Sequence, residues 1–183
     1  VLFDTQDSAS VAHAHATANF KGRIDSLILE NKAIGNIEAN AKANTNRGII
    51  NFNAYNNDTT NLFKIDGAYN YKDTLNNQID LSLEGKKINL SILEPYLNGV
   101  FSQIEGTGTT QLIIRGNNQH KSLTGFVKVN NAALKVGYTQ CRYFIENQNI
   151  KFEDGSINLN MLQIKDSLNN TATVKGNINH DFF

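Results

Sequence analysis

The chain has 183 residues, enough for one domain or for part of a longer protein. Its 17 basic and 17 acidic side chains cancel, which argues against a nucleic-acid partner because phosphate binding needs clustered Lys and Arg. A single cysteine, Cys141, excludes an internal disulfide framework, and we interpret it as a small core hydrophobe. No apolar run approaches the roughly 20 residues that span a bilayer. Because Val1-Leu2-Phe3 starts in mid-pattern and a predicted strand is beginning at His180-Asp-Phe-Phe183, we expect an internal fragment of a longer protein, with any signal or anchor outside it.

In the first half of the chain, apolar residues recur at every second position, which is typical of strands with one dry and one wet face. The pattern predicts strands over residues 11–24, 27–32, 34–43, 50–56, 63–71, 79–83 and 88–92. Residues 44–48 and 84–87 are predicted turns. The 28 asparagines support this interpretation because Asn disfavours helices and suits turns.

The second half opens with one short predicted helical segment over residues 93–101, where apolar residues have helical spacing. A strand over residues 104–116 follows, and then one over 123–136 whose apolar phase slips. A bulge near Asn130 and Asn131 would restore that phase. Segments 142–147, 149–152, 157–161 and 172–178 complete about thirteen strands, with a hairpin turn over 153–156. Because the connections are too short for crossover helices, we expect an all-β, elongated and mainly antiparallel sheet.

No constellation of residues points to an enzyme, a cofactor or a metal. His13 and His15 lie on one face of a predicted strand, about 7 Å apart, but no third ligand lies nearby in sequence. His120 is in a predicted turn and His180 is at the end of the chain. Gly106-Thr-Gly108 precedes a strand rather than opening a helix, so it lacks the geometry of a phosphate loop.

The order of several short motifs resembles the C-terminal region of the TamB family, within the AsmA-like bacterial envelope proteins, in the Asn-rich form of Bacteroidetes. The motifs lie in residues 88–183, and residues 1–87 follow the same repeat style more loosely. They read INLSILEPYL (88–97), IEGTG (104–108), LIIRG (112–116), LTG (123–125), VNNAALKV (129–136), IKF (150–152), IKD (164–166) and ATVKGNINH (172–180).

The resemblance implies a single curled groove, a β-taco with an apolar concave interior, over the whole chain. It also implies a periplasmic location in a protein anchored to the inner membrane of a Gram-negative bacterium. The family moves phospholipids between membranes, and some members assemble outer-membrane proteins with the barrel TamA. The lining would be the apolar side chains of the strands. They are Phe63, Ile65, Ile79, Leu81, Ile104, Leu112, Ile114, Val127, Val129, Leu134, Val136, Ile157, Leu159, Met161, Val174 and Ile178.

Two other functions fit the same pattern. In a structural β-sandwich or an adhesin-like segment, these side chains would fill a dry core, and periodicity alone favours that interpretation. In a chaperone-like platform, open strand edges would pair with unfolded outer-membrane strands. The resemblance favours the lipid groove, with phospholipid acyl chains as the ligand.

Overall fold

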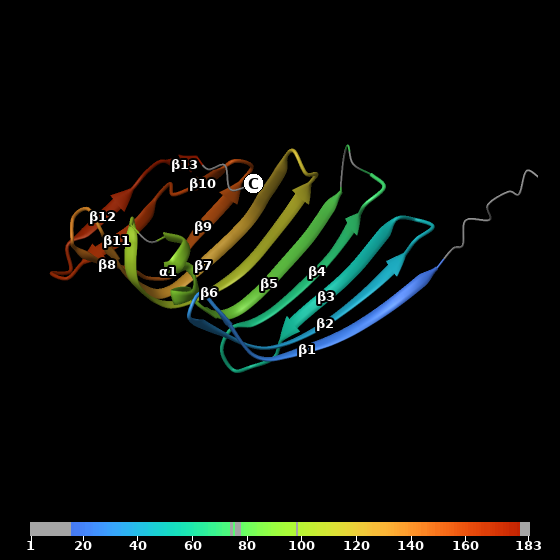
Figure 1. The fold of residues 1–183 in the computed structure, drawn as a ribbon. Helices are drawn as coiled ribbons and strands as arrows, with labels where there is room; N and C mark the ends of the chain where they lie inside the picture. The colour runs from blue at the N-terminus through green and yellow to red at the C-terminus, as the bar shows by residue number, and fades with distance from the viewer. Residues whose placement is uncertain (1–15, 74, 76–77, 98, 180–183) are drawn as a thin grey trace, which may run out of the picture.

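The computed structural model describes residues 16–73, 75, 78–97 and 99–179, and most of them lie in one open antiparallel sheet (Figure 1). The first five strands are β1 (Thr17–Leu29), β2 (Lys32–Asn44), β3 (Ile49–Asn56), β4 (Leu62–Asn70) and β5 (Ile79–Asn89). Next come β6 (Phe101–Gly116), β7 (Lys121–Val136), β8 (Arg142–Ile145) and β9 (Gln148–Glu153). The last four are β10 (Ser156–Asn158), β11 (Leu162–Asp166), β12 (Thr171–Val174) and β13 (Asn177–Asn179).

The strand order follows the sequence from β1 to β8 and continues through β11 to β12. Every pairing is antiparallel, which confirms the predicted all-β, mainly antiparallel sheet. The long strand β7 forks: residues 125–129 pair with β9, whereas residues 132–135 pair with β8. The fork lies at the predicted bulge, because Asn131 has a φ of 48° and the register with β6 shifts there.

Antiparallel register places the alternating residues of each strand on two distinct faces. One complete row runs through Phe20, Ala41, Phe52, Gly67, Leu81, Ile114 and Leu123. The face that carries this row is called the apolar face here. The neighbouring row on the opposite, polar face runs through Lys21, Asn40, Asn53, Asp66 and Ser82. The two-residue period in the sequence therefore becomes two faces of opposite character.

The predicted helical segment is present but lies earlier in the chain. A 3-10 turn, η1 (Leu90–Leu93), leads into one turn of helix, α1 (Glu94–Leu97), and β6 already begins at Phe101. The Asn89 side chain caps η1 by accepting a hydrogen bond from the Ser91 amide at 3.0 Å. The predicted strand over 88–92 is therefore wrong beyond Asn89, since a cap and a following proline favour a helical turn there.

The predicted turn over 84–87 is also wrong. Strand β5 passes through it with a bulge, marked by a register shift after Gly85 and a φ of 52° at Lys87. The prediction for Cys141 is wrong as well. This cysteine is exposed in the turn before β8, because the apolar phase of β7 ends at Val136. The predicted turn over 44–48 and the hairpin turn near Gly155 are confirmed.

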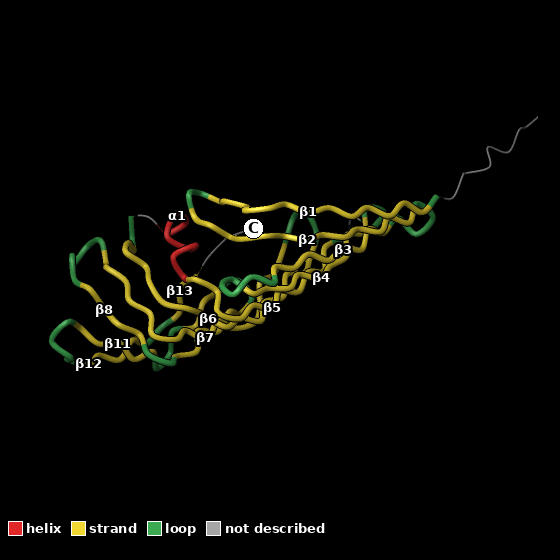
Figure 2. The backbone as a smooth tube through the Cα atoms, turned by 90° about the horizontal axis from the view of Figure 1, so that it is seen from below, coloured by secondary structure: helices red, strands yellow, loops and turns green. Residues whose placement is uncertain are grey.

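The sheet curls toward its apolar face. Leu90 packs against Ile104 and Val129, so the helical segment lies on that face above β6 and β7. Glu94 of the same segment accepts a 2.8 Å hydrogen bond from Lys32 of β2, four strands away along the sheet. In a flat sheet, four strand spacings are about 19 Å, too far for one short helical segment to bridge. Figure 2 shows the resulting curl, with α1 beside the β1–β2 turn.

Candidate functional site

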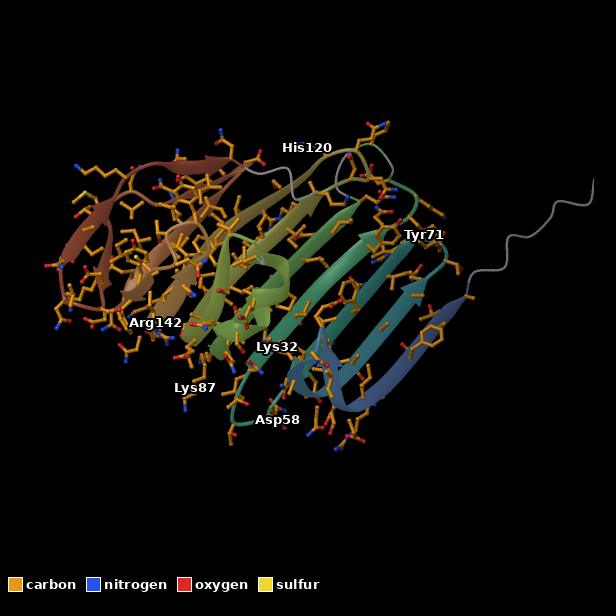
Figure 3. All side chains as sticks on the ribbon, turned by 60° about the vertical axis from the view of Figure 1, so that its left-hand side comes forward. Lys32, Asp58, Tyr71, Lys87, His120 and Arg142 are labelled. Carbon is orange, nitrogen blue, oxygen red and sulfur yellow. The ribbon has the colours of Figure 1, made fainter. Side chains whose placement is uncertain are left out.

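The apolar face runs without interruption from β1 to β7. From β1 to β7 a row of this face crosses seven strands, about 29 Å at a spacing of about 4.8 Å. The turns at the two ends of the strands form its rims. In Figure 3, Lys32, Asp58 and Lys87 lie at one rim and Tyr71 and His120 at the other.

Over β1–β5 this face is only partly covered. Phe20 and Ile24 of β1 are 62% and 51% exposed, and the side chains of β4 and β5 on this face are half-buried. Among the described elements, the helical segment 90–97 covers β6 and reaches the near end of β2. Strands β3 to β5 thus present apolar side chains with no second layer of described structure packed on them.

The predicted lining residues fall into groups. Phe63, Ile65, Ile79, Leu81, Leu112 and Ile114 lie on the partly covered face. Ile104 and Val129 are buried with Leu90, and Val127, Leu134, Leu159 and Val174 pack around them. Val136 pairs with Phe101, and Ile157 pairs with Phe152 and Ile178 at the far edge. Met161 is 62% exposed with a φ of 67°, in the turn before β11. The open surface and the core are therefore separate places.

Other residues of this face were absent from the predicted lining. Phe52 lies over Gly67: a Cβ atom at position 67 would come within 2.9 Å of the Phe52 ring and would also collide with Leu81. Gly67 thus lets an aromatic ring and a leucine meet above the backbone. The alternation of Phe52 with Ile50 and Ala54 is the signal that could have identified it.

The polar face is occupied by short-range charge pairs. Arg115 of β6 bonds to Asp80 of β5 at 3.1 Å, and Lys64 lies 2.6 Å from Asp66. The Asp66 carboxylate, by hydrogen bond and charge, raises the pKa of Lys64. These pairs are exposed and contribute little to stability, so this face is a hydrated exterior.

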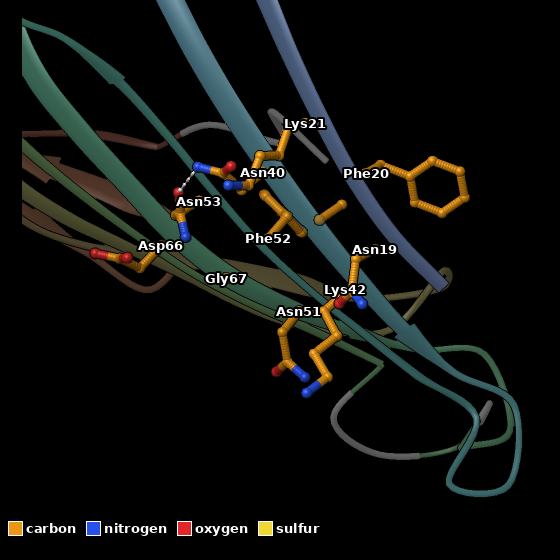
Figure 4. A pocket seen from close by; sticks show the side chains of 11 residues that line it. Asn19, Phe20, Lys21, Asn40, Lys42, Asn51, Phe52, Asn53, Asp66 and Gly67 are labelled. Atoms are coloured by element: carbon orange, nitrogen blue, oxygen red, sulfur yellow. Dashed lines mark hydrogen bonds between the residues drawn. The ribbon is translucent and has the colours of Figure 1, made fainter. Parts of the chain in front are cut away.

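A shallow pocket of about 420 Å³ lies over β1–β4 (Figure 4). Two polar-face rows line it, Asn19–Lys42–Asn51 and Lys21–Asn40–Asn53–Asp66, with the row from Phe20 to Gly67 between them. Asn40 donates to Asn53 at 3.0 Å, so one hydrogen bond joins these two amides across the pocket. Amide and ammonium groups would remain hydrated, and this pocket does not suit an acyl chain.

A second pocket, of about 450 Å³, lies at the rim beside the helical segment. Its lining is Thr60, Lys87, Asn89, Ser91, Ile104, Glu105, Gly106 and Thr107. Next to it, Glu94 accepts hydrogen bonds from Lys32 and from the Gln103 amide, at 2.8 and 2.7 Å, and both lower the pKa of Glu94. These bonds join α1 to strands on both sides of the curl.

The candidate histidines do not assemble into a site within the described chain. His120 is exposed in the turn before β7, with Nε2 3.9 Å from Asp154. His13, His15 and His180 lie outside the described residues. Residues 16–73, 75, 78–97 and 99–179 contain no cluster of three or more His, Cys, Asp or Glu suited to a metal ion.

Fold and site together define a class: an open, curled antiparallel β protein whose apolar face is packed at one end and partly uncovered at the other. No protein-family model, no curated protein and no solved structure matches this chain. Within the described residues no helix has the length and apolar character needed to cross a membrane.

Proposed function

We propose that the chain is a segment of an envelope-biogenesis protein whose apolar face carries phospholipid acyl chains between the inner and outer membranes. One observation carries the proposal: β3–β5 present an apolar face that no second described layer covers, and Phe20 and Ile24 of β1 are exposed on the same face. Leaving so much apolar surface open is costly in water and typical of a binding surface. The resemblance of the motif order to the TamB family supports the same function.

The dimensions of the face suit this ligand. Its rows run about 29 Å across the strands, and an acyl chain fills half of the roughly 30 Å hydrocarbon core of a bilayer. The curl would shelter the tail, while polar groups at the rims leave a headgroup in water. In this proposal the full-length protein is anchored at the inner membrane, works in the periplasm and meets an outer-membrane barrel such as TamA.

Site-specific photo-crosslinking in cells tests the proposal. We expect crosslinkers at Leu81 and Leu112, on the apolar face, to capture lipid. Their matched controls, Ser82 and Gln111, are adjacent residues on the same strands and point to the polar face. Equal lipid labelling on both faces, or no labelling at all, would contradict lipid binding on the apolar face and favour a purely structural role for the sheet.

A charge on the apolar face tests the same proposal in a different way. Ile114→Asp should reduce lipid capture and transport. An acyl chain bound there would take the new carboxylate out of water without a partner, which costs free energy. Because Ile114 is only half-buried, we expect the variant to remain folded. Normal lipid capture by a folded Ile114→Asp protein would contradict the proposal.

A further inference from the structure

The helical segment 90–97 lies on the apolar face at the boundary between its open and packed parts (Figure 2). Its first part, η1, contacts both β6 and β2, and α1 contacts β6. In the strand order, the open strands β3–β5 precede the covered strands β6 and β7, and β8, β11 and β12 follow them. A ligand that moves along this face from strand to strand therefore meets the helical segment.

Two kinds of contact hold the helical segment in place. Leu90 and Leu97 pack on the core cluster of β6 and β7. The contact of α1 with β2 is polar instead, because Glu94 accepts a hydrogen bond from Lys32 at 2.8 Å and one from the Gln103 amide of β6 at 2.7 Å. The Lys32 and Glu94 side chains are 29% and 28% exposed, so water has access to this ion pair. Apolar packing thus anchors the segment, and the ion pair ties it to the other side of the curl.

We propose that the helical segment is a gate on the lipid path, held shut by the Lys32–Glu94 ion pair. Shut, it separates the open face of β3–β5 from the apolar side chains of β8, β11 and β12. When the ion pair separates, α1 leaves β2 and Leu90 leaves its cluster, so the two parts of the apolar face become continuous. The gate rests on the proposed function, since it needs an apolar ligand to admit.

The helical segment is suited to local opening. Its α-helical part is a single turn, and a helix this short is not stable on its own in water. Leu93 and Val100 are 42% and 58% exposed, so part of its apolar surface is already in solvent. At Gly99, which has a φ of 95°, an added Cβ atom would meet no described atom within 4 Å. Segments with few buried apolar contacts are the first to open in a folded protein.

Thiol labelling measures the opening without lipid. In a Cys141→Ser background, which removes the exposed native thiol, Val129→Cys places a thiol in the Leu90 cluster at a position that is 3% exposed. Glu94→Lys turns the attraction to Lys32 into repulsion and should raise the labelling rate roughly fivefold. The charge-swapped chain, Lys32→Glu with Glu94→Lys, should return most of the way to the original rate. Because a lysine cannot accept the Gln103 hydrogen bond, this recovery reports the ion pair itself.

Glu153→Lys is the matched control, because it makes the same change at the exposed Lys151 pair of the β9–β10 hairpin. It should leave the labelling rate unchanged. Urea unfolding of each variant establishes that the rates belong to folded protein. Equal rates in Glu94→Lys and Glu153→Lys, or no recovery in the charge-swapped chain, would overturn the gate.

Photo-crosslinking in cells tests whether the gate admits lipid. Leu81 of β5 lies on the open face, and Ile164 of β11 packs on the core cluster beyond β7. We expect lipid at Leu81 in every chain. At Ile164, lipid labelling should rise roughly fivefold in Glu94→Lys and fall again in the charge-swapped chain. Lipid at Leu81 with unchanged labelling at Ile164 would overturn the gate alone, whereas no lipid at Leu81 would overturn the proposed function.

Discussion

The strands β1–β5 and β6–β12 share one apolar face, but they bury it differently. In the second group Ile104, Val129, Ile145 and Leu162 are buried around Leu90. Among the described residues of β1–β5, Ile37 is the buried hydrophobic side chain, and Phe20 is 62% exposed. The same alternation thus produces a packed core in one half and an open face in the other.

The difference arises from the elements that pack on the apolar face and not from the alternation of apolar residues in the sequence. The fork of β7 adds β8 and β11 to the sheet, and their side chains Ile145 and Leu162 join the cluster that contains Leu90. No described element plays that part above β3 and β4. Alternation therefore determines which face is apolar, whereas the helical segment and the fork determine where that face becomes a core.

The largest expected effect is the loss of stability when a charge is introduced into the packed half, compared with the same change in the open half. Ile104→Asp buries a carboxylate without a partner and should destabilise the fold by about 3–5 kcal/mol. Ile114→Asp, ten residues along the same strand but on the open face, should cost about 1 kcal/mol. Urea unfolding of both variants measures the contrast. Similar losses would mean that the open face is packed after all.

The second effect removes volume from the centre of the core. Leu90→Ala should cost about 2–4 kcal/mol, because a cavity remains under the helical segment. The control, Leu93→Ala, alters the same segment at a side chain that is 42% exposed, and it should cost less than about 1 kcal/mol. Thermal unfolding distinguishes them. If the two variants unfold together, Leu90 does not hold the packed half.

The third effect concerns a buried asparagine that joins β2 to the end of β5, where η1 begins. The Asn61 side chain donates to the Ala33 carbonyl at 3.1 Å and accepts from the Asn89 amide at 2.8 Å. Asn61 is 4% exposed and has a φ of 56°, so Asn61→Gly removes the side chain without straining the backbone. We expect a loss of about 1–3 kcal/mol, from buried groups left unpaired.

Asn31→Gly is the matched control. Asn31 also has a positive φ, 65°, but its side chain is exposed in the β1–β2 turn. It should leave stability almost unchanged. Hydrogen exchange at the Asn89 amide should accelerate in Asn61→Gly alone. Unchanged protection there would show that Asn61 does not couple β2 to the start of η1.

The sequence predicted the parts of this comparison that depend on local pattern. Alternation identified most of the strands and the apolar side of 104–116, and the phase slip identified the bulge at Asn131. It was wrong in dividing β1 into 11–24 and 27–32, in extending 157–161 into the turn before β11, and in merging β12 and β13 into 172–178. It could not separate Ile104 from Ile114, since both occupy the same side of one strand. Their difference arises from Leu90, which approaches from a helical turn that the pattern placed three residues too late.

The sequence pattern also could not show which asparagines are buried. Composition indicated turns, but Asn56 and Asn61 are buried at 1% and 4% exposure. Asn56 donates to the Ile34 carbonyl at 2.8 Å. Such a role depends on which backbone groups the curl brings near, and no two-residue period encodes it.

The smallest expected effect is a pH dependence at the ion pair that holds α1 to β2. Hydrogen bonds from Lys32 and the Gln103 amide lower the pKa of Glu94 below its ordinary value of 4.5. A carboxyl with a lowered folded pKa stabilises the fold above its unfolded pKa, and this contribution is lost as the pH falls through the folded pKa. Acid should therefore weaken the attachment of α1 to β2.

Glu94→Gln isolates this contribution because it removes the titration and keeps the shape. We expect the wild-type chain to be the more stable at neutral pH, and the gap to close as the pH drops below 4.5. Glu153→Gln is the control. Glu153 also has a lowered pKa and pairs with Lys151, but this pair is exposed in the β9–β10 hairpin, away from α1.

Protection of the Gln103 amide against hydrogen exchange is the local measure. It should fall with pH in the wild type and in Glu153→Gln, but it should be low and independent of pH in Glu94→Gln. A pH-independent difference between the wild type and Glu94→Gln would mean that this ion pair does not join the open half to the packed half.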